Sequence, residues 1–203
     1  MNKENLACVI GLCGRSGSGK SSFCALAKEQ GFKVIDCDAV YAELVSSLTP
    51  CLIEIREHFG ENSVIDGKLN RKAVGEIVFN DKEKLELLNK ITHKHITNRI
   101  FEIIGGYKED ELVILDAPTL FESGLDASCV SVIAIIAPDE CCLARITERD
   151  GITEEQARLR LSNQRTNDFV IENSDYIIYN ETTQEDFLKA SGALLAAIKE
   201  ELD

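Results

Sequence analysis

The chain has 203 residues, of which 44% are hydrophobic and 28% charged, a composition that suits a globular domain with a substantial core. Its formal net charge of −13 reflects 22 Lys and Arg against 35 Asp and Glu, which argues against a broad basic face for nucleic acid. No apolar run approaches the ~20 residues of a membrane span, so neither a nucleic-acid partner nor a membrane partner is expected.

The first residues, MNKENLACVI, lack the long apolar stretch and the small-residue cleavage site of a signal peptide, so a cytoplasmic location is expected. None of the eight cysteines stands in a C-x-x-C pair, and both a disulfide framework and a zinc site are disfavoured. In a chain this acidic, an anionic ligand must meet positive charge that is gathered locally.

Short apolar runs rich in β-branched residues recur along the chain and have the length of buried strands. They cover residues 6–13, 32–38, 111–118, 129–138 and 174–180. Helical patterns lie between them at 21–31, 81–106 and 153–165, and the last of these opens on Thr153 and Gln156, which fit a capping box. Strands that alternate with helices predict an α/β fold, with a parallel sheet of about five strands flanked by helices.

Two stretches interrupt this alternation. Residues 41–109 are too many for a simple crossover and predict a mainly helical insertion, and residues 139–173 form a smaller excursion rich in arginine. The core of the fold is then expected to comprise residues 1–40, 110–138 and 174–203.

A glycine-rich stretch follows the first predicted strand and precedes the first predicted helix. Gly14, Gly19, Lys20 and Ser21 fit G-x-x-x-x-G-K-[ST], the pattern of a phosphate-binding loop. Glycines let backbone N–H groups approach a phosphate, Lys20 brings an ammonium group to the β- and γ-phosphates, and Ser21 offers a hydroxyl to Mg²⁺. The sequence therefore predicts an ATP site. Its residues are Gly14, Arg15, Ser16, Gly17, Ser18, Gly19, Lys20, Ser21 and Ser22.

Acidic residues at strand ends narrow the class of protein. No N-K-x-D guanine motif is present, which disfavours a GTPase, and Asp116 is followed by Ala117 instead of the second acid expected of a remodelling ATPase. Asp116 suits a position near Mg²⁺ or its water shell, although it could also cap the next turn. Asp36 and Asp38 alternate across the end of the second strand, and Asp38 is the candidate base for an acceptor hydroxyl. The alternative for Asp38 is a cap on the next helix.

Arginines gather in the second excursion. Arg145 and Arg149 are four residues apart and share a helix face, where guanidinium groups could stabilise a transferring phosphoryl group or could simply be solvated. Arg158, Arg160 and Arg165 follow, which favours a flap that closes over the phosphates.

Taken in order, these motifs resemble those of the dephospho-coenzyme A kinases over nearly the whole chain. The resemblance runs through GLCGRSGSGKS, VIDCDAV, FGENSVIDGKLNRKAVGEIVFND, LNKITHKHI, DAPTLFESGLD, RITERDGITEEQARLRLSNQ and SDYIIYN. It implies a P-loop kinase fold in which the insertion binds the coenzyme A acceptor and residues 139–173 form a lid. It further implies that Asp38, Lys20, Arg145 and Arg149 are catalytic. The substrate-binding residues that it implies are Asp36, Arg71, Phe79, His93, Asp116, Glu122, Arg160 and Gln164.

The chain departs from the pattern of the resembled family at four positions. Lys94 stands where Pro usually follows the histidine, Thr119 replaces a Leu, Val170 replaces a common Lys, and Arg15 replaces a usual Gly. Two of these, Lys94 and Thr119, lie in acceptor-binding parts and leave the identity of the acceptor open. His93 and His95 diverge by about 200° on a helix, which disfavours a metal pair.

The expected activity is ATP- and Mg²⁺-dependent phosphorylation of the ribose 3′-hydroxyl of dephospho-coenzyme A. Two alternatives remain at this point: a kinase of another small-molecule or nucleotide acceptor, and a regulator that binds nucleotide without turnover.

Overall fold

The computed structural model describes residues 7–79 and 81–202. Within them the chain divides into two compact units, one formed by residues 7–35 and 107–202 and the other by residues 36–79 and 81–106. We call them the sheet unit and the helical unit, and describe each by itself.

The sheet unit is built on a five-stranded sheet whose strand order is β2-β5-β1-β6-β7. Strand β1 runs parallel to both β5 and β6, and β6 runs parallel to β7. The expected parallel α/β sheet flanked by helices is confirmed. The strands are β1 (Cys8–Cys13), β2 (Lys33–Asp36), β5 (Leu112–Asp116), β6 (Ser131–Ile136) and β7 (Tyr176–Tyr179).

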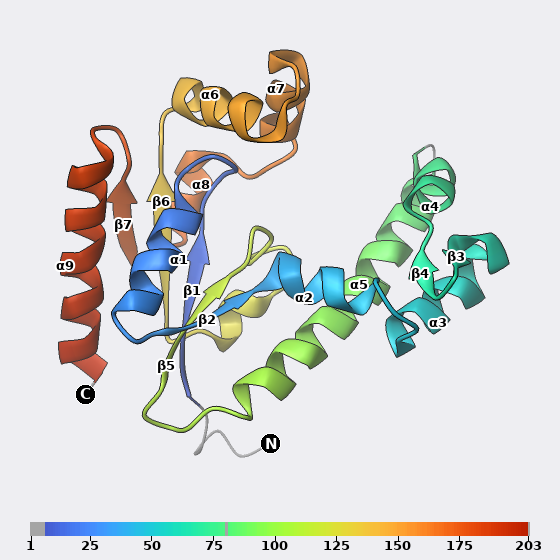
Figure 1. Ribbon diagram of the computed structural model, residues 1–203, viewed down its shortest axis with the longest axis horizontal. Coiled ribbons are helices and arrows are strands. Elements are labelled where there is room, and N and C mark those ends of the chain that lie inside the picture. Colours follow the sequence, from blue (N-terminus) through green and yellow to red (C-terminus); the bar gives the residue numbers. More distant parts are fainter. Residues whose placement is uncertain (1–6, 80, 203) are drawn as a thin grey trace. The chain divides into compact units, whose positions relative to one another are not determined.

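Helices α1 (Lys20–Glu29) and α9 (Gln184–Leu202) pack side by side, and α1 also packs on β5 and α9 on β7 (Figure 1). Phe23 of α1 and Phe187 of α9 are almost completely buried against the apolar side chains of the central strands. This burial removes large apolar surfaces from water and is the main contribution to the stability of the unit. The close packing also fixes where the loop between β1 and α1 lies.

Three further helices follow β6: α6 (Asp139–Asp150), α7 (Glu154–Ser162) and α8 (Asn167–Glu172). Helices α6 and α7 pack on one another around a small apolar core that includes Ile146 and Ala157, both fully buried. Thr153 and Gln156 form the predicted capping box at the start of α7. In Figure 1 α6 and α7 lie beyond the end of β6, on the side from which the β1–α1 loop leaves the sheet, and α8 packs beside β6.

The helical unit holds the helices α2 (Cys37–Leu44), α3 (Pro50–Phe59), α4 (Arg71–Val78) and α5 (Lys82–Ile104), with a 3-10 turn at Glu61–Ser63 and a two-stranded hairpin of β3 (Val64–Ile65) and β4 (Lys68–Leu69). The long helix α5 packs against α2, α3 and α4. Each of these four helices is capped at its start by a side chain that accepts a hydrogen bond from a backbone N–H group of the first turn, as expected where short polar residues precede a helix. The capping residues are Asp36, Thr49, Asn70 and Asp81.

The predicted element boundaries differ from the observed ones mainly at strand ends. The start of the first strand at residue 6 falls outside the described residues, and the strand predicted at 32–38 ends at Asp36. The prediction that Asp38 ends a strand is therefore wrong. The side chain of Asp36 accepts a hydrogen bond from the backbone N–H of Ala39 and begins α2 at Cys37, so Asp38 lies in the first turn of a helix. No helix in the described residues combines the length and hydrophobicity needed to cross a bilayer.

Candidate functional site

The loop predicted to bind phosphate joins β1 to α1, and its backbone has positive φ angles at Gly14 (141°), Gly17 (78°) and Gly19 (117°). Other chain segments approach it closely. A Cβ atom at position 14 would lie 2.4 Å from the carbonyl oxygen of Ile135, and one at position 17 would lie 2.7 Å from that of Cys142. The loop therefore requires glycine at these positions both for its dihedral angles and for space.

Helix α1 begins at Lys20, directly after the loop. Its N-cap residue, Gly19, has no side chain to accept hydrogen bonds from the first turn. The N–H of Ser22 donates to the Gly19 carbonyl oxygen at 3.1 Å, which leaves the N–H groups of Lys20 and Ser21 for an anion. The ammonium group of Lys20 lies over the loop and donates to the carbonyl oxygens of Gly14 (2.8 Å) and Arg15 (3.5 Å). The geometry brings one cation and a row of backbone donors together, as binding of a triphosphate requires.

Asn180 is a site residue that sequence reasoning missed. It directly follows β7 and is buried, and its side-chain amide donates to the carbonyl oxygen of Ser18 at 2.7 Å. The same side chain accepts a hydrogen bond from Arg145 Nη2 at 3.4 Å. The signal was present in the sequence, since Asn180 is a polar residue at the carboxyl end of an apolar parallel strand, where ligand sites gather.

Asp116 ends β5 and faces α1. The thiol of Cys24 on α1 donates to its Oδ2 atom at 3.7 Å. Burial, together with the nearby Asp116 carboxylate, raises the pKa of Cys24 to about 12, so the sulfur stays protonated at neutral pH. Asp116 and the exposed Ser21 in the first turn of α1 thus offer oxygen ligands for a metal ion, and the protonated thiol of Cys24 does not compete with them as a metal ligand. Among the described residues there is no cluster of three or more His, Cys, Asp or Glu that would hold a metal by itself.

The two arginines of α6 have different partners. Arg145 donates from Nη1 to the carbonyl oxygen of Gly17 at 3.0 Å and so touches the loop directly. Arg149 donates from Nε and Nη2 to the carboxylate of Asp150, at 2.7 and 3.0 Å. Arg160 on α7 donates to the same carboxylate. These bonds, from Arg149 first and then Arg160, hold the pKa of Asp150 well below its usual range. Of the two arginines of α6, Arg145 contacts the loop and Arg149 contacts Asp150.

Three consecutive residues of the loop contact the segment 139–173. The Arg15 guanidinium bonds to the side chain of Asp139 and, at 2.9 Å, to the carbonyl oxygen of Leu161. The Ser16 N–H donates to Gln164 Oε1 and Gln164 Nε2 donates back to Ser16 Oγ, both at 3.0 Å. With the contact from Arg145 to Gly17, these bonds dock the segment on the loop.

Glu122 follows β5 and accepts a hydrogen bond from Arg165 Nε at 2.9 Å. The Arg165 guanidinium also stacks on Phe169 at 4.5 Å, and Phe169 in turn meets Phe121 edge-on. Glu122, Arg165 and Phe121 line a small pocket beside Gly14, together with Gln164. The structure thus places the predicted residues Glu122 and Gln164 next to the phosphate-binding loop.

The remaining predicted site residues belong to the helical unit. Asp38 is exposed in the first turn of α2. One turn later on the same helix, the ring of Tyr41 packs against the Arg71 guanidinium, 5.4 Å from its centre to Cζ. Burial raises the pKa of Tyr41, so its hydroxyl stays neutral. Phe79 is 85% exposed at the end of α4, and His93 is half-buried on α5.

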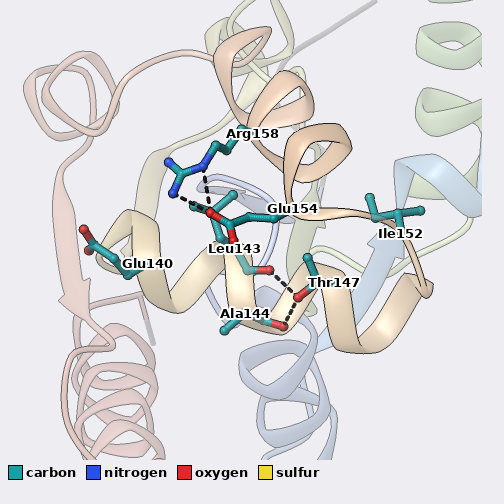
Figure 2. Close-up of a pocket in the computed structure, with 7 residues that line it drawn as sticks. All are labelled: Glu140, Leu143, Ala144, Thr147, Ile152, Glu154 and Arg158. Carbon is teal, nitrogen blue, oxygen red and sulfur yellow. Dashed lines mark hydrogen bonds and ion pairs between the residues drawn. The ribbon is translucent and has the colours of Figure 1, made fainter.

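A separate groove of about 490 Å³ lies along α6 and α7, lined by Leu143, Ile152, Glu140, Glu154 and Arg158 among others (Figure 2). Its one lining arginine, Arg158, pairs with Glu154 at 2.6 Å. The lining has two carboxylates and one neutralised cation, which is the wrong charge for a triphosphate. The geometry therefore favours the glycine loop as the nucleotide site.

Comparison with known proteins agrees with this assignment. The sequence model of a family described as dephospho-CoA kinase matches residues 8–186. The chain belongs to the dephospho-CoA kinase family.

Individual relatives cover almost the whole chain. A dephospho-CoA kinase of Fusobacterium nucleatum is 39% identical over 183 residues, covering 89% of this chain and 93% of the relative. A crystal structure from Thermus thermophilus superposes with a TM-score of 0.82 at 28% identity, covering 96% and 97% of the two chains. A dephospho-CoA kinase from Campylobacter jejuni gives a TM-score of 0.71 at 30% identity, covering 95% and 98%.

Two of the chain's departures from the pattern of the dephospho-CoA kinases are explained by local packing. Lys94 donates to both carboxylate oxygens of Glu54, at 2.7 and 2.5 Å, and His95 contacts the same group at 2.7 Å. These bonds hold the pKa of Glu54 below its usual range and join α3 to α5. Val170 is buried and packs as an apolar residue. Nothing in the structure explains Thr119, which is exposed.

The close approach at Gly17 generates a prediction. Gly17→Ala introduces a Cβ against the Cys142 carbonyl at a φ of 78° and should weaken ATP binding more than tenfold, because the loop must shift. Isothermal titration calorimetry with ATP measures this. The matched control is Gly67→Ala, which has a similar φ of 72° but no atom closer than 3.8 Å. Equal ATP affinity in the two variants would contradict the proposed role of this contact.

Proposed function

We propose that this chain transfers the γ-phosphoryl group of ATP to the ribose 3′-hydroxyl of dephospho-coenzyme A, giving coenzyme A and ADP. This is the last step of coenzyme A biosynthesis, and a cytoplasmic location is part of the proposal. The observation that carries it is the glycine loop with Lys20 over its carbonyls and Arg145 docked on Gly17, in a chain of this family. All eight cysteines lie in the described residues and none forms a disulfide, which is consistent with a reducing compartment.

ATP is held mainly by backbone groups in this proposal. The N–H groups of the loop and of the first turn of α1 bind the phosphates, and the ammonium group of Lys20 exchanges its two carbonyl contacts for phosphate oxygens. Arg145 already lies at the loop, where its planar guanidinium can meet the charge that develops on the transferring group. Charge stabilisation of this kind accounts for most of the catalysis of phosphoryl transfer.

Mg²⁺ fits the oxygen donors at the start of α1 and the end of β5. Ser21 and Asp116 would hold it, directly or through water, since Mg²⁺ prefers oxygen ligands and keeps several waters. When bound, the ion neutralises negative charge on the phosphates. The protonated thiol of Cys24 leaves Asp116 free of competition from a soft ligand and helps to orient its carboxylate.

Asp38 is proposed as the base. Its carboxylate takes the proton of the 3′-hydroxyl as that oxygen attacks the γ-phosphorus, the bond from that phosphorus to the bridging oxygen of ADP breaks, and ADP leaves. Asp36 supports this role through the backbone, because its cap on α2 fixes the first turn in which Asp38 lies.

The acceptor is proposed to bind the helical unit, with Glu122, Arg160 and Gln164 of the sheet unit as further substrate contacts. Arg71 offers a guanidinium that Tyr41 holds by its ring, suited to a phosphate of the acceptor. Phe79 offers an 85% exposed ring that suits stacking on a base, and the half-buried His93 offers a polar group on α5.

The test is a coupled assay of ADP release with dephospho-coenzyme A, AMP, adenosine or no acceptor. Dephospho-coenzyme A should stimulate release far more than the others. Equal stimulation by AMP would indicate another acceptor, and tight ATP binding without turnover would indicate a regulator.

Asp38→Asn should lower kcat by ~10²–10⁴ and leave ATP affinity nearly unchanged, because it removes the base and keeps the shape of the side chain.

The contacts of the two α6 arginines generate a further prediction. Arg145→Ala should lower kcat by ~10²–10³, as expected on losing a donor to the developing charge. Arg149→Ala should change kcat about twofold at most, because its guanidinium is bound to Asp150. Steady-state kinetics of the two variants measure this difference. A larger loss of kcat in Arg149→Ala than in Arg145→Ala would reverse the assignment.

A further inference from the structure

Arg15 lies in the phosphate-binding loop, yet its side chain contacts a different part of the chain. Its Nη1 atom donates to Asp139 Oδ1, and its Nη2 atom donates to the carbonyl oxygen of Leu161 at 2.9 Å. The side chain is only 11% exposed. Both amino groups of the guanidinium are thus occupied by residues outside the loop.

The two partners of Arg15 lie at the start and at the finish of one helix pair along the chain, and the shared guanidinium brings these two points close together in space. Asp139 is the first residue of α6, and Leu161 lies in the last turn of α7. The two helices share their own apolar core, with Ile146 and Ala157 at its centre. Because the two helices pack as one body and the guanidinium bonds to both of them, Arg15 ties the whole pair to the loop at this point.

The neighbouring loop residues add bonds in the same place. Ser16 exchanges two hydrogen bonds with Gln164, and Gly17 accepts one from Arg145. Of these contacts, only that of Arg15 is an ion pair with a carboxylate; the Arg15 side chain is 11% exposed and that of Asp139 is 55% exposed. Charge-assisted bonds are stronger than neutral ones.

We propose that Arg15 is a positioning residue that keeps the α6–α7 pair docked on the phosphate-binding loop and thereby slows the release of nucleotide. The helix pair carries Arg145, which lies over Gly17, so the pair must move away before a nucleotide held by the loop can leave. Moving it breaks the ion pair with Asp139 and the bond to Leu161 together. The inference rests on the proposed ATP site and is independent of which acceptor is used.

The test is the dissociation rate of a fluorescent N-methylanthraniloyl derivative of ADP, displaced by excess ADP with Mg²⁺ in a stopped-flow instrument without acceptor. Arg15→Ala should raise the rate about tenfold or more, the order expected on losing a charge-assisted hydrogen bond. KM for ATP should rise more than kcat falls, because the catalytic groups remain. The dissociation rate of Arg15→Lys should lie between those of the parent and of Arg15→Ala. An ammonium group keeps the charge opposite Asp139 but lacks the planar guanidinium that also reaches Leu161.

Asp139→Ala leaves Arg15 in place and should raise the dissociation rate in the same direction. If the two residues act through one shared bond, their effects on the dissociation rate should not multiply. The increase in the double variant should therefore be clearly smaller than the product of the increases in the two single variants. The matched control is Arg158→Ala. That arginine lies on α7 and pairs with Glu154 within its own helix (Figure 2), so its loss should leave the rate unchanged.

Dissociation rates within twofold of the parent in Arg15→Ala and Asp139→Ala would overturn the proposal, as would an equal increase in Arg158→Ala. If Arg15→Ala does not fold by circular dichroism, Arg15→Lys and Asp139→Ala decide the question by the same criterion. ADP release stimulated by dephospho-coenzyme A in the parent chain is a separate readout, so failure of the acceptor assignment is distinguishable from failure of this inference.

Discussion

Close approach of other chain segments to the backbone of the phosphate-binding loop is the constraint on which the site depends. The end of β6 reaches Gly14, helix α6 reaches Gly17, and Asn180 after β7 reaches Gly19, each within a distance that no Cβ atom would tolerate. These elements come from parts of the chain more than a hundred residues away from the loop. The parallel sheet brings them together because the carboxyl ends of its strands share one edge. The buried amide of Asn180 then fixes the loop carbonyl at Ser18 and leaves N–H groups for the ligand.

The electrostatics of the chain follow from the same arrangement. With a net charge of −13 the protein repels anions at a distance, and in the proposed site a triphosphate is attracted by backbone donors, Lys20 and Arg145. Other arginines near the site pair with carboxylates, as Arg149 and Arg160 do with the single carboxylate of Asp150. Positive charge is thereby reduced away from the loop, which favours a small anionic ligand over an extended polyanion.

The sequence was sufficient to predict the sheet and the loop, because apolar runs and glycine spacing reflect local requirements of strands and of phosphate binding. It was insufficient where a contact joins distant residues. The partners of Arg15 are 124 and 146 positions away, and no local pattern indicates them. Asp38 was predicted at a strand end because two acids alternate there, but the cap formed by Asp36 starts the helix earlier. In that case a local capping bond decided the structure and the strand pattern did not.

The identity of the phosphorylated product tests the central claim most directly. The product formed from ATP and dephospho-coenzyme A should be analysed by mass spectrometry and by phosphorus–proton correlation in NMR. The account predicts one added phosphate whose phosphorus correlates with the ribose H3′ proton, in an amount equal to the ADP released. ADP released with inorganic phosphate and no modified acceptor, or a phosphate on any other position, would contradict it.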